Sequence, residues 1–335
     1  MNRAWDPTNP EPFSPPACFP SALWPPLWSV VQSPGVGCLG CGSYSGHTRS
    51  PGYEESGLHF VSIGHLTRDV VTDGYTLGGT AAYAAITARR LGATVTVVTR
   101  AHPDDTRHPA LEGITVVNLP GALTTTFHNI YEDGRRRQLV RAVAAPIFAH
   151  EVPPALREAE AVLLGPVAQE VDPTIAPRLH GLVGVVPQGW LREWDEYGRV
   201  YGIPWYSAGR VLPYTDVLVV STQDLAADPD FARQVRTGAP IVVITLAAQG
   251  CALYVEGREQ LVPPRPAQEV DPTGAGDVFA AAFLVRLHET RDPVQAAYFA
   301  NITASFSVEG QGVSGIPTRA QVEAYLRSHP WSPRL

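Results

Sequence analysis

A short run of small residues and aspartates near the C-terminal end of the chain is best suited to do chemistry. Residues 271–277 read Asp-Pro-Thr-Gly-Ala-Gly-Asp, and an alanine-rich helical pattern follows them. Gly274 and Gly276 let the backbone approach a ligand closely. Together with Ala275 they present the unpaired first N–H groups of a helix, which can hold an anion such as a phosphate. Asp277 lies beside them, where a carboxylate could take a proton from an attacking hydroxyl.

An ordinary helix start with an acidic first turn is the alternative interpretation of residues 274–277. The longer run, however, resembles the C-terminal signature of the ribokinase-like (PfkB-type) carbohydrate kinases, Asp-Thr/Pro-Thr-Gly-Ala-Gly-Asp-x-Phe. The resemblance implies a three-layer α/β/α fold with a mostly parallel central sheet and a small β-sheet lid. It also implies ATP and Mg²⁺ as cofactors, and a monovalent cation such as K⁺ at Asp271 and Thr273.

Two motifs between residues 64 and 85 resemble the substrate-binding motifs of the same family. Residues 64–69 read Gly-His-Leu-Thr-Arg-Asp after an apolar strand pattern, and the family's acid at the place of Asp69 binds substrate hydroxyls. Gly78 and Gly79 open the second motif, and their backbone is expected to hold further hydroxyls. The family's asparagine in this motif is Tyr83 here, which leaves the role of that side chain open.

The nucleotide side of the resemblance rests on three further positions. Ser221 and Asp224 take the outer places of the family's Asn-x-x-Glu, which organises Mg²⁺ and phosphate. Thr245 and Gly250 match the ends of Thr-x-Gly-x-x-Gly, with alanine in place of its first glycine. Asn301 matches a position near the adenine, and an ordinary exposed helix asparagine is its alternative interpretation.

The pattern of one branch, the plant-type myo-inositol kinases, is closest to this chain. Residues 188–192 contain its Gln-x-x-x-Arg element, and residues 271–273 contain its Asp-Pro-Thr. The resemblance implies an ATP-dependent kinase that phosphorylates a hydroxyl of a small polyol or sugar, with myo-inositol as the first candidate. Kinases of the same fold that act on ribose, fructose, a keto-deoxy acid or a nucleoside remain alternatives. So does a catalytically silent relative that only binds its ligand.

Composition narrows the class of protein further. The 335 residues carry a formal net charge of −7, which argues against nucleic-acid binding. No apolar run approaches the ~18–20 residues that would span a bilayer. Four cysteines, three of them before residue 42, do not form a disulfide framework. We therefore expect a cytoplasmic enzyme, a monomer or homodimer, with a small-molecule substrate and neither nucleic-acid nor membrane partners.

The chain divides near residue 57. Residues 1–57 hold 10 of the 32 prolines and show no helical or strand period, which predicts a disordered extension. Gly-x-Gly-x-x-Gly at 35–40 lacks the flanking strand and helix of a nicotinamide site, and one Cys-x-x-Cys at 38–41 is weak evidence for zinc. Residues 58–330 are predicted to form the kinase domain.

Strands and helices alternate in this second part, which predicts a parallel sheet covered on both faces. A lid hairpin is expected at about 124–143, around an Asp-Gly turn. The other predicted strands are at about 59–64, 93–99, 114–118, 161–164, 182–186, 215–220 and 241–246, and the predicted helices are at about 79–91, 275–288, 292–307 and 318–328.

Overall fold

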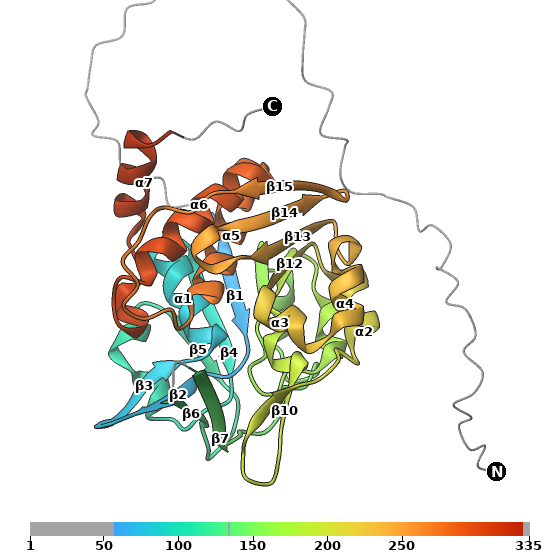
Figure 1. Ribbon diagram of the computed structural model, residues 1–335. Coiled ribbons are helices and arrows are strands. Elements are labelled where there is room, and N and C mark those ends of the chain that lie inside the picture. The colour runs from blue at the N-terminus through green and yellow to red at the C-terminus, as the bar shows by residue number, and fades with distance from the viewer. Residues whose placement is uncertain (1–56, 133–134, 331–335) are drawn as a thin grey trace, which may run out of the picture. The chain divides into compact units, whose positions relative to one another are not determined.

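The computed structural model describes residues 57–132 and 135–330 of the chain (Figure 1). The predicted N-terminal extension, with the two weak patterns inside it, lies outside the described residues apart from Gly57. The Asp-Gly turn at 133–134 lies outside them as well. No helix in the described ranges is long and apolar enough to cross a membrane.

The main sheet has nine strands. They are β1 (His59–Ile63), β4 (Thr94–Thr99), β5 (Thr115–Asn118), β8 (Ala161–Leu164), β9 (Leu182–Val185), β12 (Val217–Ser221), β13 (Ile241–Thr245), β14 (Cys251–Val255) and β15 (Arg258–Val262). Their spatial order is β15-β14-β13-β12-β9-β8-β1-β4-β5. All neighbours from β13 to β5 are parallel, whereas β14 and β15 are antiparallel.

Helices cover both faces of this sheet (Figure 1). One face carries α1 (Thr80–Arg90), α5 (Ala275–Thr290), α6 (Pro293–Ser307) and α7 (Arg319–Ser328). The other carries α2 (Ala208–Val211), α3 (Thr222–Ala227) and α4 (Pro229–Gln234). Alternate residues of a strand serve the two layers: Phe60 packs in the first core and Val61 in the second. The predicted three-layer α/β/α fold is confirmed.

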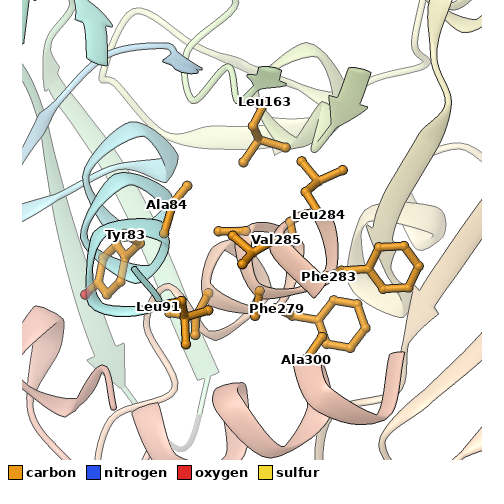
Figure 2. Close-up of a cluster of buried hydrophobic side chains, with 14 of the residues drawn as sticks. Tyr83, Ala84, Leu91, Leu163, Phe279, Phe283, Leu284, Val285 and Ala300 are labelled. Atoms are coloured by element: carbon orange, nitrogen blue, oxygen red, sulfur yellow. The ribbon is translucent and has the colours of Figure 1, made fainter. Parts of the chain in front are cut away.

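The first core fixes α5, the helix that begins at the glycine-rich run. Figure 2 shows Phe279, Phe283 and Leu284 of α5 among side chains from α1, α6 and the sheet. Nine residues of α5 are buried, as expected for a helix that is covered by neighbours on several sides. The N-terminus of α5 is therefore held firmly relative to the sheet.

A second, four-stranded sheet forms the lid. It consists of β2 (Thr67–Val71), β3 (Gly74–Gly78), β6 (Thr125–Glu132) and β7 (Arg135–Ala142), in the order β3-β2-β6-β7. The strands β6 and β7 pair antiparallel over the residues predicted as a hairpin. A separate antiparallel pair joins β10 (Arg192–Trp194) and β11 (Val200–Gly202).

Candidate active site

The predicted site residues gather at the carboxyl edge of the main sheet. Ser221 ends β12, Thr245 ends β13, and the two are register partners in adjacent parallel strands. Gly64 directly follows β1, and the lid begins three residues later. Ligands of open α/β sheets bind outside the carboxyl ends of the strands. The fold thus brings the substrate and nucleotide motifs to one edge.

The start of α5 has the geometry of an anion site. Gly274 is the N-cap, with φ 75° and ψ 0°, and no side chain caps the helix. This left-handed conformation favours glycine. A Cβ atom on Gly276 would meet no atom within 4 Å, so the space beside it is open. The Ala275 amide was predicted to be unpaired. In the structure it instead donates a hydrogen bond to the Pro272 carbonyl at 3.2 Å.

Asp277 lies in the first turn of α5 and has an unusual electrostatic environment. Burial raises its pKa to about 7, and the like charges of Asp224 and Asp69 contribute to the rise. The side chains of Thr80 and Arg192 act in the opposite direction and lower the pKa. A carboxylate with a pKa near neutrality suits proton transfer at physiological pH.

Thr80 links the second glycine motif to Asp277. It is the first residue of α1, is 1% exposed, and follows Gly79 at φ 88°. Its hydroxyl is buried without a hydrogen bond of normal length in the described part of the chain, and its proximity to the Asp277 carboxylate lowers the pKa of that group. The starts of α1 and α5 therefore meet at the catalytic candidate.

Asp69 lies on β2, directly over the second glycine motif. A Cβ atom on Gly78 would fall 2.3 Å from its Oδ2 atom, so only glycine admits the carboxylate here. The Thr67 hydroxyl donates a hydrogen bond to the other oxygen at 3.4 Å. Gly79 in turn lies close to the backbone of His65. The residues predicted to bind substrate, Asp69, Gly78 and Gly79, therefore form one compact corner of the lid.

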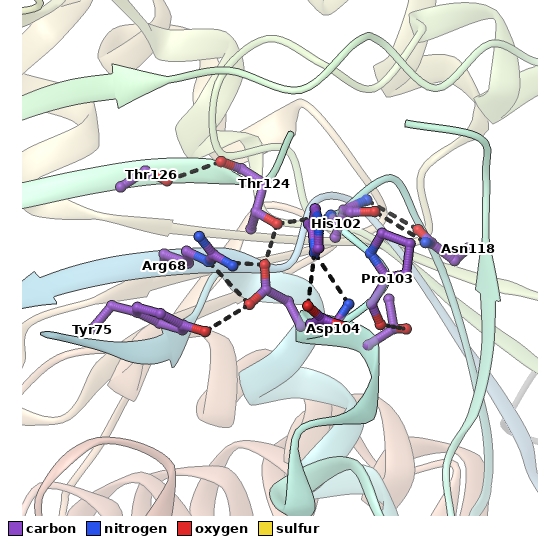
Figure 3. A network of polar contacts seen from close by, with 11 residues as sticks. Arg68, Tyr75, His102, Pro103, Asp104, Asn118, Thr124 and Thr126 are labelled. Atoms are coloured by element: carbon purple, nitrogen blue, oxygen red, sulfur yellow. Dashed lines mark hydrogen bonds and ion pairs between the residues drawn. The ribbon is translucent and has the colours of Figure 1, made fainter. Parts of the chain in front are cut away.

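Arg68, the neighbour of Asp69, makes its contacts on the opposite face of the lid strand (Figure 3). Successive residues of a strand point to opposite faces. The Arg68 guanidinium lies over the Tyr75 ring, with 4.3 Å between its central carbon and the ring centroid. Its Nε atom is 2.9 Å from a carboxylate oxygen of Asp105, which is buried. The Tyr75 hydroxyl donates to the same carboxylate at 3.1 Å.

Ser221 and Asp224 form a capping box at the start of α3. Oδ2 of Asp224 accepts hydrogen bonds from the Ser221 amide at 2.9 Å and from its hydroxyl at 2.7 Å. No cluster of three or more metal-ligating His, Cys, Asp or Glu side chains occurs in residues 57–132 and 135–330. Asp224 and Asp277 nevertheless interact as like charges, and their carboxylate oxygens are of the ligand type that a hydrated Mg²⁺ would prefer.

Asp271 organises the loop that precedes α5. One of its oxygens accepts a hydrogen bond from the Thr273 amide at 3.0 Å, and the other accepts one from the Gly312 amide at 2.9 Å. Both contacts explain an acid at this position without a bound ion. The assignment of Asp271 and Thr273 to a monovalent cation stays a prediction.

The remaining nucleotide-side residues, Gly250 and Asn301, both lie against the end of β15. Gly250 has φ 88°, and a Cβ atom there would fall 2.3 Å from the Val262 carbonyl. Asn301 is 5% exposed, and its amide nitrogen donates to the carbonyls of Val262 at 2.9 Å and Pro263 at 3.2 Å. It is therefore not an exposed helix residue, and its amide nitrogen is engaged by the backbone. Its observed contacts hold the chain that leads out of β15.

Three residues that shape the site had no assigned role in the sequence analysis: Thr80, Tyr83 and Arg192. Arg192 was visible only as part of the Gln-x-x-x-Arg element, and it begins β10. Tyr83 is 3% exposed, and burial, followed by the charges of Asp271, Asp69 and Asp277, raises its pKa. The sequence alone gives no signal for these roles, because each role depends on charged residues from segments that are far apart in the chain.

Comparison with known proteins agrees with this geometry. Residues 210–319 match the pfkB family of carbohydrate kinases. The chain is 30% identical over 331 residues to the inositol 3-kinase of Oryza sativa subsp. japonica, a match that covers 90% of this chain and 79% of that protein.

Solved structures of two kinases share the fold. One is a pyrophosphate-dependent kinase in the ribokinase family, complexed with a pyrophosphate analog and myo-inositol; it has a TM-score of 0.68 and 24% identity and covers 79% of this chain and 99% of its own. The other is ribokinase of Arabidopsis thaliana with ribose and ATP, with a TM-score of 0.61 and 19% identity, covering 83% of this chain and 100% of its own. At these identities the two structures establish the ribokinase-like fold.

Proposed function

The chain belongs to the pfkB family of carbohydrate kinases and is a phosphotransferase that acts on an alcohol group, and we propose that it transfers the γ-phosphate of ATP to a hydroxyl of myo-inositol. The observation that carries this proposal is the environment of Asp277. This carboxylate stands at an open helix N-terminus, has a pKa of about 7, and interacts electrostatically with Asp69 on the lid strand.

In the proposed mechanism Asp277 accepts the proton of the attacking hydroxyl. The hydroxyl oxygen forms a bond to the γ-phosphorus, the bond from phosphorus to the bridging oxygen breaks, and ADP leaves. The N–H groups at Gly274 and Gly276 stabilise the charge on the transferring group, because helix N-termini favour anions. Asp69 and the backbone of Gly78 and Gly79 orient the acceptor by hydrogen bonds to its other hydroxyls.

Asp224 is the residue that would hold Mg²⁺, through water molecules, since this ion dehydrates reluctantly. When bound, the ion would neutralise negative charge on the phosphates. The capping box fixes Asp224 through one oxygen and leaves the other to orient water. We also propose that Asp271 and Thr273 bind a monovalent cation.

A neutral polyol suits the substrate corner better than an acidic sugar. The corner offers a carboxylate and glycine backbone, which donate to and accept from hydroxyl groups. Arg68 is the basic residue within the two substrate motifs, and it is engaged by Asp105 and Tyr75. The named rice relative is an inositol kinase, which supports myo-inositol over ribose or fructose.

The test is a panel of acceptors and donors with the purified protein. Myo-inositol, ribose, fructose, a keto-deoxy acid and a nucleoside are offered with either ATP or pyrophosphate, and the phosphate ester is detected directly. Pyrophosphate is included because a structural relative uses it. The proposal expects myo-inositol with ATP to give the highest kcat/KM. A higher kcat/KM with another acceptor would contradict the assignment of myo-inositol, and a higher kcat/KM with pyrophosphate would contradict the assignment of ATP. Ligand binding without turnover would indicate a catalytically silent relative.

The role of Asp277 is tested in the same assay. We expect Asp277→Asn to keep ligand binding and to lower kcat at least ~100-fold, the usual scale for a positioned general base. Asp230→Asn is the matched control, because Asp230 also lies in the first turn of a helix but is exposed on α4. Near-normal turnover of Asp277→Asn would exclude the assigned role.

A further inference from the structure

Tyr83 is a buried side chain that the proposed mechanism leaves without a role. It belongs to the first turns of α1 and is 3% exposed, so it offers almost no surface to a substrate. Figure 2 shows it at the edge of the apolar cluster that Phe279 and Val285 of α5 also join. Its hydroxyl points away from those two side chains.

The Tyr83 ring lies directly against Gly274, the N-cap of α5. A Cβ atom on Gly274 would fall 2.3 to 2.4 Å from three ring carbons, so the ring occupies the space of the missing side chain. Gly274 has φ 75°, the left-handed conformation that begins the helix. A rigid ring at this point limits how far Gly274 can move and, with it, the amides that follow.

The Tyr83 hydroxyl lies near a second segment, the connection between α6 and α7. It is 3.7 Å from the place of a Cβ atom on Gly312, whose amide donates to the Asp271 carboxylate at 2.9 Å. Burial and the charges of Asp271, Asp69 and Asp277 raise the pKa of Tyr83, so the side chain stays neutral. It therefore packs beside the site without adding a negative charge to the three carboxylates.

We propose that Tyr83 is a positioning residue for phosphoryl transfer. Its ring holds Gly274 in the conformation that aims the amides of Gly274 and Gly276 at the transferring phosphate. This inference rests on the proposed function and extends it to a residue that touches neither ligand. An asparagine side chain at this position would have no ring and could not fill the same space.

Two variants separate the ring from the hydroxyl. We expect Tyr83→Asn to lower kcat at least ~10-fold while KM for myo-inositol changes less than ~3-fold, because misaimed amides affect the transition state more than binding. Tyr83→Phe keeps the ring and should recover most of the lost kcat. Tyr254→Asn is the control for general destabilisation: Tyr254 is buried, but it pairs with Val242 near the start of β13, away from the carboxyl edge.

A double-mutant cycle tests the contact itself. Gly274→Ala places a methyl group against the ring, so its effect on the melting temperature should be smaller in the Tyr83→Asn background than alone. Equal effects in both backgrounds, or wild-type kcat for Tyr83→Asn, would overturn the inference. A wild-type protein without kinase activity would instead overturn the proposed function, and the melting-temperature cycle would then still decide whether the ring holds Gly274.

Discussion

Arg68 and Asp105 form an ion pair that joins the lid to the main sheet, with 2.9 Å between Nε and Oδ2. Arg68 lies on the lid strand β2, whereas Asp105 lies in the connection after β4. The Asp105 side chain is 3% exposed and also accepts hydrogen bonds from the hydroxyls of Tyr75 and Thr124. One buried carboxylate therefore holds three donors from two lid strands and the segment before a third.

Removal of this carboxylate should weaken the protein measurably. We expect Asp105→Ala to lower the free energy of unfolding by about 1–3 kcal/mol, because the buried Thr124 hydroxyl loses its acceptor and the Arg68 guanidinium loses its ion-pair partner. Urea denaturation of the variant measures this change. The adjacent Asp104→Ala is the control, since its carboxylate is 70% exposed and its contact with Arg107 is 3.7 Å long. That substitution should change stability by less than about 0.5 kcal/mol. Equal effects of the two substitutions would contradict the anchoring role of Asp105.

The pH dependence of kcat/KM should report the ionisation of Asp277. A general base acts only when ionised, so kcat/KM should rise with pH through about 7 and level off above it. Arg192→Gln removes a positive charge that favours the ionised form, so the rise should move to higher pH. Asp224→Asn removes a like charge, so the rise should move to lower pH. We expect shifts of about half a pH unit or more in each case.

The two variants are expected to shift the pH profile in opposite directions, so together they test whether Asp277 is the titrating base. Loss of Mg²⁺ organisation in Asp224→Asn would lower the height of the profile, but it gives no reason for the rise to move to lower pH. Arg199→Gln is the control for charge alone, because Arg199 is exposed and paired with Asp195 at 2.8 Å. A profile that moves in the same direction in both site variants would exclude Asp277 as the titrating base.

The sequence predicted those parts of the fold that depend on local pattern. The strands of the parallel sheet are apolar runs, and α5 begins at Ala275 as the glycine run indicates. The sequence analysis did not predict the strands β2, β3, β10, β11, β14 and β15 or the helices α2, α3 and α4. Thr67–Val71, for example, mixes polar and apolar residues, and Cys251–Val255 follows a turn that is interpreted as part of a nucleotide motif.

The site could be predicted less completely than the fold. Asp277 and Asp69 lie in recognisable motifs, and in the structure the charge of Asp69 raises the pKa of Asp277. The effects of Thr80 and Arg192 on Asp277 join segments that are far apart in the sequence, so no local pattern encodes them. The hydrogen bonds from the Asn301 amide nitrogen to two backbone carbonyls were likewise not predictable, and the role of Asn301 near the nucleotide stays a prediction.

The domain boundary that the sequence predicts near residue 57 can be tested by truncation. Leu58 and Phe60 are fully buried, whereas residues 1–57 lack any periodic apolar face. A chain that begins at Gly57 should therefore fold and keep full kcat and melting temperature. A chain that begins at Ser62 loses most of β1, which lies between β4 and β8, and should not fold. Loss of soluble expression from the longer of these two chains would show that the N-terminal residues stabilise the domain.

Asp69 provides the test of substrate recognition. Loss of a buried hydrogen-bond partner of a hydroxyl costs about 1–3 kcal/mol, and more when the partner is charged. We therefore expect Asp69→Ala to lower kcat/KM for myo-inositol by about 10-fold or more, while KM for ATP stays nearly unchanged. Asp73→Ala is the matched control, because Asp73 lies in the exposed turn of the same lid hairpin. An equal rise in KM for both ligands would place Asp69 outside the acceptor site. Efficient use of an acidic sugar by the wild-type protein, with myo-inositol ignored, would overturn the neutral-polyol assignment and leave the role of Asp277 intact.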